Sequence, residues 1–195
     1  MQMRAEARRR AVWRAVAACG LWLALAAAAS AQSGVVSREE ALAAVFPGAT
    51  ISADRVFLTE GQVEQVAALS HADVASKIFA RYVARRDGAV VGRAYVDTHI
   101  VRTKRESLLV SLETDGRVRR IDVTAFLEPP EFVPSEPWRR QYYDNPLSDD
   151  LAVHRSIRPI AGATLTTGAV NAAVRRVLAL DQVLEARAAD AGALP

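Results

Sequence analysis

The sequence is poor in cysteine and histidine, and this limits the chemistry that it can perform. Cys19 is its only cysteine and lies among the first 31 residues. The rest of the chain therefore offers no disulfide, thiolate metal site or cysteine nucleophile. The three histidines, His71, His99 and His154, are far apart in the sequence, and we expect each in a turn or on the surface. No metal site is predicted.

Several familiar site motifs are also missing. The sequence contains no H-E-x-x-H, G-x-S-x-G, G-x-G-x-x-G or C-x-x-C pattern. It therefore lacks the local signatures of zinc proteases, α/β-hydrolases, dinucleotide-binding folds and dithiol redox sites. No pair of residues suited to acid–base catalysis stands out either, so we assign no catalytic residues.

Positive charge is scarce once the start of the chain is set aside. Of 25 basic and 22 acidic residues, five arginines and one glutamate lie within residues 1–31, which leaves 20 basic and 21 acidic residues in the remainder. A nearly neutral chain lacks the basic surface on which nucleic-acid binding depends. We expect no nucleic-acid partner.

The first residues have the pattern of an export signal. An arginine-rich start precedes an apolar run from Ala15 to Ala29, and Ala29-Ser30-Ala31 forms an A-x-A cleavage site. The run is shorter than the roughly 20 residues that a membrane-spanning helix needs. We predict a signal peptide over 1–31, with an uncleaved anchor as the alternative, and a single domain over 32–195. Either way the domain is periplasmic or otherwise extracytoplasmic.

Helix signals stand at both ends of this domain. Capping boxes at Ser37 to Glu40 and Thr59 to Gln62 predict two amphipathic helices, the first ending at Pro47-Gly48. The last helix is expected from about Thr167 to about Ala188. Its predicted buried stripe consists of Val170, Ala173, Val174, Val177, Asp181 and Leu184, with Arg175 and Arg176 outside it.

The middle of the domain has the pattern of an antiparallel sheet. Asp87-Gly88 and Asp115-Gly116 are favoured hairpin turns, each flanked by strand-like segments. Ile121, Val123 and Ala125 alternate with polar residues, which predicts one buried and one solvated face. The proline-rich stretch 127–138 is expected to be a loop, followed by about one helical turn. The predicted fold is α+β, a mostly antiparallel sheet flanked by helices.

The stretch "AGATLTT" directly precedes the last predicted helix. Unpaired N–H groups at a helix start stabilise a phosphate, and Gly162 lets the backbone bend or approach a ligand closely. Ala163 is small, and Thr164, Thr166 and Thr167 carry hydroxyls that can bond a phosphate. A purely structural interpretation is also open, in which Thr166 or Thr167 caps the helix and Gly162 makes the turn.

The same stretch resembles the flavinylation motif of the covalent FMN-binding domain, S/T-G-A-T-x-T/S. That domain occurs in small extracytoplasmic subunits of the sodium-translocating NADH:quinone oxidoreductase and of the Rnf electron-transport complex, and in stand-alone exported flavoproteins. There a flavin transferase joins FMN to the threonine after Gly-Ala through a phosphoester bond. The resemblance implies Thr164 as the acceptor, with Thr166 as the second choice.

The resemblance extends over roughly residues 88 to 180. "LETDGRVRRIDVTAFLEPPEF" is similar to the family's strand–turn–strand and Glu-x-Pro segment, and "WRRQYYDNPL" to its aromatic stretch. Three features differ: Ala161 stands where the family has serine or threonine, Arg158 stands where it often has an acid, and "EPPEF" lacks the glycines that usually follow the family's Glu-Thr-Pro.

The resemblance also implies surroundings for the flavin ring, which needs an apolar wall and hydrogen bonds to its polar edge. Candidates for the wall are Trp138, Tyr142 and Leu165, and candidates for polar contact are Glu128 and Thr166. Ordinary core packing is an equally open role for Trp138 and Tyr142.

The expected function is that of an electron carrier, which exchanges electrons with a membrane redox complex or another donor and acceptor. Two alternatives stay open. "SREEALAAVFPG" resembles the helix of PepSY-type exported domains, which implies a binding module without a cofactor. The chain can also be an FMN-domain relic whose motif has decayed at Ala161 and Arg158.

Overall fold

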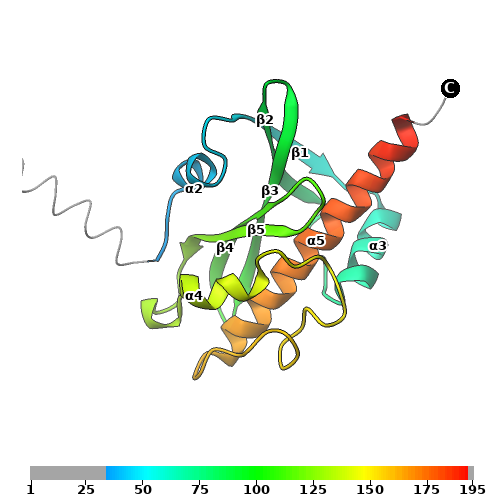
Figure 1. Ribbon diagram of the computed structural model, residues 1–195. Coiled ribbons are helices and arrows are strands. Elements are labelled where there is room, and N and C mark those ends of the chain that lie inside the picture. Colours follow the sequence, from blue (N-terminus) through cyan, green and yellow to red (C-terminus); the bar gives the residue numbers. More distant parts are fainter. Residues whose placement is uncertain (1–33, 193–195) are drawn as a thin grey trace, which may run out of the picture. The chain divides into compact units, whose positions relative to one another are not determined.

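Five antiparallel strands, each hydrogen-bonded to the next in the chain, form the sheet on which the fold is built (Figure 1). The computed structural model describes residues 34–192, so the predicted signal or anchor, 1–31, lies outside the described residues. The strands are β1 (Thr50–Phe57), β2 (Ile78–Arg86), β3 (Ala89–Val101), β4 (Lys104–Leu112) and β5 (Val118–Phe126).

Both predicted hairpins are confirmed. Asp87 and Gly88 connect β2 to β3, and their φ values of 51° and 82° are the left-handed geometry that a two-residue hairpin turn requires. Gly116, with φ of 84°, lies in the turn between β4 and β5. The strand β1 was not predicted, because nearly all of its residues are exposed and it carries no turn signal of this kind.

Two of the helices begin where their capping boxes predicted. In α2 (Arg38–Val45) the Ser37 hydroxyl accepts from the Glu40 N–H, and the Glu40 carboxylate accepts from the Ser37 N–H. Thr59 and Gln62 make the same reciprocal pair at α3 (Glu60–Ser70). The helical turn expected after the prolines is α4 (Glu136–Arg139), with short 3₁₀ turns at Pro130–Phe132 and Arg140–Tyr142.

The last helix, α5 (Thr164–Gly192), begins three residues earlier than predicted. Gly162 reverses the chain at a φ of 76°, and the Ala163 N–H bonds to the Ile160 carbonyl just before the helix. Thr166 and Thr167 therefore lie inside the helix and do not cap it. Within residues 34–192, α5 included, no helix is long and apolar enough to span a bilayer.

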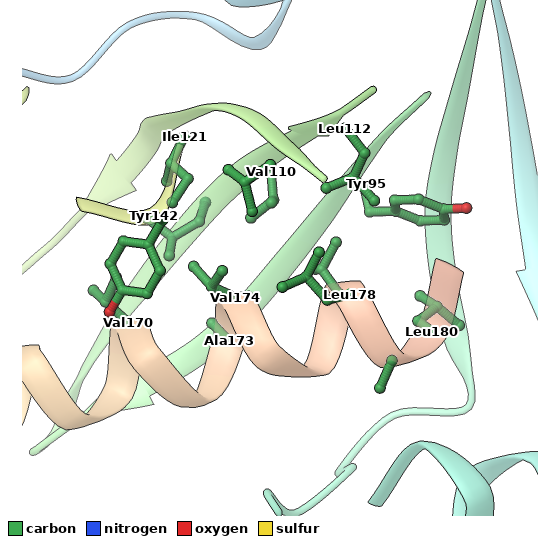
Figure 2. Close-up of a cluster of buried hydrophobic side chains, with 14 of the residues drawn as sticks. Tyr95, Val110, Leu112, Ile121, Tyr142, Val170, Ala173, Val174, Leu178 and Leu180 are labelled. Carbon is green, nitrogen blue, oxygen red and sulfur yellow. The ribbon is translucent and has the colours of Figure 1, made fainter. Parts of the chain in front are cut away.

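The helices lie in two layers, one on each face of the sheet (Figure 1). On one face α5 packs directly against the strands, with α3 beside it. Figure 2 shows side chains of α5, among them Val170, Val174 and Leu178, directed at Val110 and Ile121 of the sheet. On the other face α2 packs through Leu42 and Phe46.

Helix α5 is buried more completely than a single stripe predicts. Leu178, Ala179 and Leu180 are at most 3% exposed, because sheet and α3 cover opposite sides of the helix. Arg175, expected outside the stripe, is also buried. Its guanidinium donates to carbonyls that include that of Ser70 at the end of α3, 2.7 Å away, where the helix dipole is negative.

A bulge in β5 changes the predicted alternation. Leu108 pairs with Val123 but Ser107 pairs with Ala125, so Thr124 is an extra residue. Ala125 therefore faces away from the core, and Phe126 packs inward in its place.

Candidate functional site

A hollow of about 150 Å³ lies where the start of α5 meets one end of the sheet. Three segments far apart in the sequence line it: the β3–β4 hairpin, the loop after β5, and the residues around the first turn of α5. Its lining residues are Val101, Arg102, Glu128, Phe132, Gly162, Ala163, Thr164, Leu165 and Thr166. The structure thus brings together six of the eight residues that the sequence predicted for the site.

The three threonines differ in accessibility. Thr164 is exposed at the first position of α5, whereas Thr166 is 4% exposed and Thr167 fully buried. The Thr167 hydroxyl accepts from the Ile160 N–H at 2.9 Å and donates to the Ala163 carbonyl at 3.0 Å. Thr167 therefore stabilises the turn around Gly162, whereas the Thr164 hydroxyl makes no hydrogen bond with a described residue.

The first turn of α5 has unused hydrogen-bonding capacity. Its first three N–H groups, at positions 164 to 166, make no hydrogen bond with any described residue, as expected at a helix start. Arg102, on the hairpin across the hollow, is exposed and makes no ion pair with a described residue. The helix dipole and the guanidinium favour an anionic group such as a phosphate, whereas the Glu128 carboxylate, which lines the same hollow, opposes it.

The β3–β4 hairpin brings Arg102 to this position. Val101 pairs with Lys104, and Arg102 takes a left-handed φ of 55° in the two-residue connection. A Glu128 carboxylate oxygen lies 3.5 Å from the Thr103 N–H, which links the hairpin to the loop after β5. Nothing local in the sequence indicated Arg102, because it lies some sixty residues before Thr164 in the chain.

Two predicted wall residues lie elsewhere. Tyr142 is fully buried in the core, its hydroxyl accepts from Asn171, and Figure 2 shows its ring beside Val170. Trp138 stacks edge-to-face on Tyr142 with ring centroids 5.6 Å apart, and its indole N–H donates to the Arg158 carbonyl. Both have the core-packing role that the sequence left open. The aromatic side chain at the hollow is Phe132, which sequence reasoning missed.

His99, expected in a turn, instead lies on β3 in a buried cluster of charges next to the hollow. Its ring nitrogens lie 2.9 Å from an Asp97 oxygen and 3.1 Å from a Glu106 oxygen. Arg176 of α5 donates two hydrogen bonds to Asp97. Burial lowers the pKa of His99, but the hydrogen bonds to both carboxylates outweigh it and raise the pKa to about 9. His99 is therefore a cation at neutral pH.

Comparisons of the chain with protein-family models, curated proteins and solved structures found no match. Among residues 34–192, no group of three or more histidine, cysteine, aspartate or glutamate side chains is arranged to hold a metal ion. The geometry of the hollow is therefore the basis for assigning a function.

Proposed function

We propose that the chain is an extracytoplasmic electron-transfer flavoprotein that carries FMN on Thr164 through a phosphoester bond. One observation carries the proposal: of the three threonines in the motif, Thr164 alone has an exposed side chain, beside a hollow that favours an anion. Thr166, the second choice, is 4% exposed and less accessible to a transferase.

The residues of the hollow fit the phosphate end of such a group. A phosphodiester keeps one negative charge, which the free N–H groups of α5 and the Arg102 guanidinium stabilise. The hollow, about 150 Å³, is smaller than the roughly 300–1,000 Å³ clefts that enclose a whole cofactor-sized ligand. It suits a tether better than a closed binding pocket.

Several of the lining residues then have a defined role. Gly162 turns the chain so that Thr164 begins the helix at the surface. Leu165, 54% exposed, and Phe132 provide apolar surface at the rim, while Glu128 holds the hairpin that carries Arg102. When attached, FMN would supply one- and two-electron redox chemistry, which the side chains of this protein cannot supply by themselves.

The proposal implies two kinds of partner. A flavin transferase must reach the Thr164 hydroxyl during maturation, and the exposure of that residue permits this. A membrane redox complex, or another donor and acceptor, must then approach the same end of the sheet. Permanent attachment suits an exported protein, because a dissociated cofactor would be lost from the compartment.

The test is direct. The full-length chain is co-expressed with a flavin transferase in an exporting host, denatured, and analysed by in-gel flavin fluorescence and by mass. We expect a mass increase of one FMN less one water, lost in Thr164→Ala and retained in Thr166→Ala and in the hairpin control Thr103→Ala. Absence of the adduct in the unaltered chain would reject the proposal, and its persistence in Thr164→Ala would reassign the acceptor.

A second candidate function is an exported binding module without cofactor, of the PepSY type suggested by the first helix. The observation that favours it is a sheet face that α2 covers only in part. An unmodified chain that still binds a partner through this face would support the module over the flavoprotein.

A further inference from the structure

The face of the sheet opposite α5 is only half covered. Helix α2 packs against Tyr82, Ala84, Ala94 and Leu109, toward the β2–β3 turn. At the other end of the same face, large apolar side chains are exposed. These form what we call the exposed apolar band, and they are Phe57 (64% exposed), Ile78 (53%), Ile100 (60%) and Leu127 (62%).

The band has members on β1, β2 and β3 and one just beyond β5, while the β4 position in the same row is Arg105. Phe57 and Ile78 are paired across β1 and β2. Ile100 lies on β3 and pairs with Arg105 of β4. The Leu127 N–H, just beyond β5, bonds to the Arg105 carbonyl at 3.0 Å. Register and alternation therefore place all four side chains on one face at one end of the sheet.

This concentration of exposed apolar side chains is unusual for the molecule. The described residues include six large hydrophobic side chains that are exposed, and four of them belong to the band. Exposed apolar side chains gathered on one face of a soluble domain, here with exposed Arg105 between Ile100 and Leu127, are typical of an interaction site.

Two exposed arginines without an ion pair to any described residue lie within the band. Arg55 and Arg105 share its outward-facing positions, both are exposed, and neither makes an ion pair with a described residue. Asp54, Asp97 and Glu106 of the same strand segments lie by alternation on the opposite, α5-facing side. Asp122 of β5 lies on the face of the band, but it is buried and paired with Arg120. An occupant with apolar and acidic surface would be complementary to the band.

The shape of this face favours a helix over a flat surface. Helix α2 rises above one half of the face by a helix thickness, about 10 Å, so the band forms the lower part of a step. A flat bilayer resting on α2 would not reach the band. A helix of about 13 residues is about 20 Å long and matches the width of five strands spaced about 4.8 Å apart.

We propose that the exposed apolar band docks an amphipathic helix of a partner protein, whose apolar stripe is flanked by acidic residues. The helix would lie beside α2 and complete the second layer of the fold. Ile100 and Leu127 are each adjacent in sequence to a residue that lines the hollow, Val101 and Glu128. A docked partner would thus be held next to the hollow, although its docking does not require an attached flavin.

The experiment uses the full-length chain and labelled synthetic helices of 14 residues. One peptide has a leucine stripe flanked by glutamates, a second has the same stripe flanked by lysines, and a third has the acidic composition scrambled. Binding is followed by fluorescence anisotropy at low and high salt. We expect saturable binding of the acidic amphipathic peptide, at least about tenfold tighter than either of the others and weakened by salt.

Substitutions in the chain test whether the peptide binds at the exposed apolar band. Phe57→Ser with Ile100→Ser should weaken binding by at least about tenfold, and Arg55→Glu with Arg105→Glu should abolish the preference for the acidic peptide. Leu69→Ser and Arg187→Glu, exposed on α3 and α5, are the matched controls and should change little. Thermal unfolding of each variant checks that the fold is retained.

Three results would overturn the proposal. One is the absence of saturable binding by the acidic peptide. The second is binding that the band variants do not affect. The third is that no peptide binds but the band supports another association. Self-association through the band would assign it to a second copy of the chain, and binding of anionic vesicles through the band would assign it to a membrane. Flavin attachment at Thr164 is scored separately by mass, so its failure and this one are distinguishable.

Discussion

The middle and the start of α5 contact the sheet in opposite ways. Near the middle of the helix, Asp181 accepts from Arg93 at 2.6 and 2.8 Å and from the Tyr95 hydroxyl at 2.7 Å, and all three residues are at most 5% exposed. At its start, the Thr164 hydroxyl, the first N–H groups and Arg102 have no partner among the described residues. The first arrangement has its charges paired within the chain, whereas the second has groups that make no hydrogen bond or ion pair with a described residue.

This contrast separates stability from function along one helix. Buried charges that satisfy one another hold α5 on the sheet but have no capacity left for a ligand. Exposed, unpaired groups contribute little to folding and remain available for binding. Substitutions at the buried charges of α5 and β3 should therefore lower stability without changing flavin attachment. Substitutions at the start of α5 should change flavin attachment with little effect on stability.

The largest effect is expected at the buried ion pair. Asp181→Ala removes the acceptor that the buried Arg93 guanidinium and Tyr95 hydroxyl share. Among the described residues Arg93 keeps only the Thr114 carbonyl and the Glu185 carboxylate at 3.4 Å, so the free energy of unfolding should fall by about 3 kcal/mol. Denaturant titration followed by circular dichroism measures this. Asp150→Ala is the control, because its side chain is 87% exposed and its pairing with Arg155 is worth at most about 1 kcal/mol. Similar losses in the two variants would contradict the contrast.

The next effect is a dependence of stability on pH at His99. Its pKa rises from 6.5 in the unfolded chain to about 9 in the folded one, so the folded state binds the proton more tightly. The resulting stabilisation is fully present below pH 6.5 and is lost as the pH rises through 9. It amounts to about 3 kcal/mol at most.

Unfolding measured from pH 6 to pH 10 should therefore show a decline that is absent in His99→Gln, which cannot bind the proton. The control is His71→Gln, since that side chain is 67% exposed on the surface. An equal decline in His99→Gln would assign the pH dependence to another group. Flavin attachment should be unchanged in both variants.

The fold could be predicted wherever a local signal determined it. The helix start at Ser37 and Glu40 and the hairpin turn at Asp87 and Gly88 are each determined by residues within four positions of one another. Both could therefore be predicted from the sequence. Tertiary effects were not predictable in this way. The bulge at Thr124 and the burial of Arg175 depend on neighbouring strands and on the end of α3.

The candidate site divides in the same manner. The segment from Gly162 to Thr166 was predicted because its residues are contiguous and resemble a known motif. Arg102 and Phe132 were missed because only the fold brings them to the hollow. Trp138, for which wall and core packing were equally open, lies in α4 and packs on Tyr142, because the sequence has no signal that distinguishes the two roles.

A smaller effect should separate two neighbouring threonines. Thr167→Ala removes a buried hydroxyl that bridges the Ile160 N–H and the Ala163 carbonyl, and should cost about 1–2 kcal/mol. Thr164→Ala removes an exposed hydroxyl and should change stability by less than about 0.5 kcal/mol. The mass assay should give the opposite order, with the adduct lost only in Thr164→Ala. A large loss of stability in Thr164→Ala would mean that its hydroxyl is structural.

Effects of opposite sign are expected at the two glycines on either side of Thr164. A Cβ at Gly162 or at Gly168 would meet no described atom within 4 Å, so sterics with neighbours do not distinguish them. Gly162 has a φ of 76°, where an L-residue is strained, and Gly162→Ala should cost about 1 kcal/mol. Gly168 is helical, and Gly168→Ala should stabilise by up to about 1 kcal/mol.

Thermal unfolding of the two glycine variants shows whether each substitution raises or lowers stability. The mass assay shows whether it changes the yield of the flavin adduct. If the bend at Gly162 serves to present the Thr164 hydroxyl, the yield of adduct should fall in Gly162→Ala and stay unchanged in Gly168→Ala. Equal yields would mean that α5 presents Thr164 whatever the geometry of the preceding turn. The bend at Gly162 would then have a structural role only and would not serve to present the Thr164 hydroxyl.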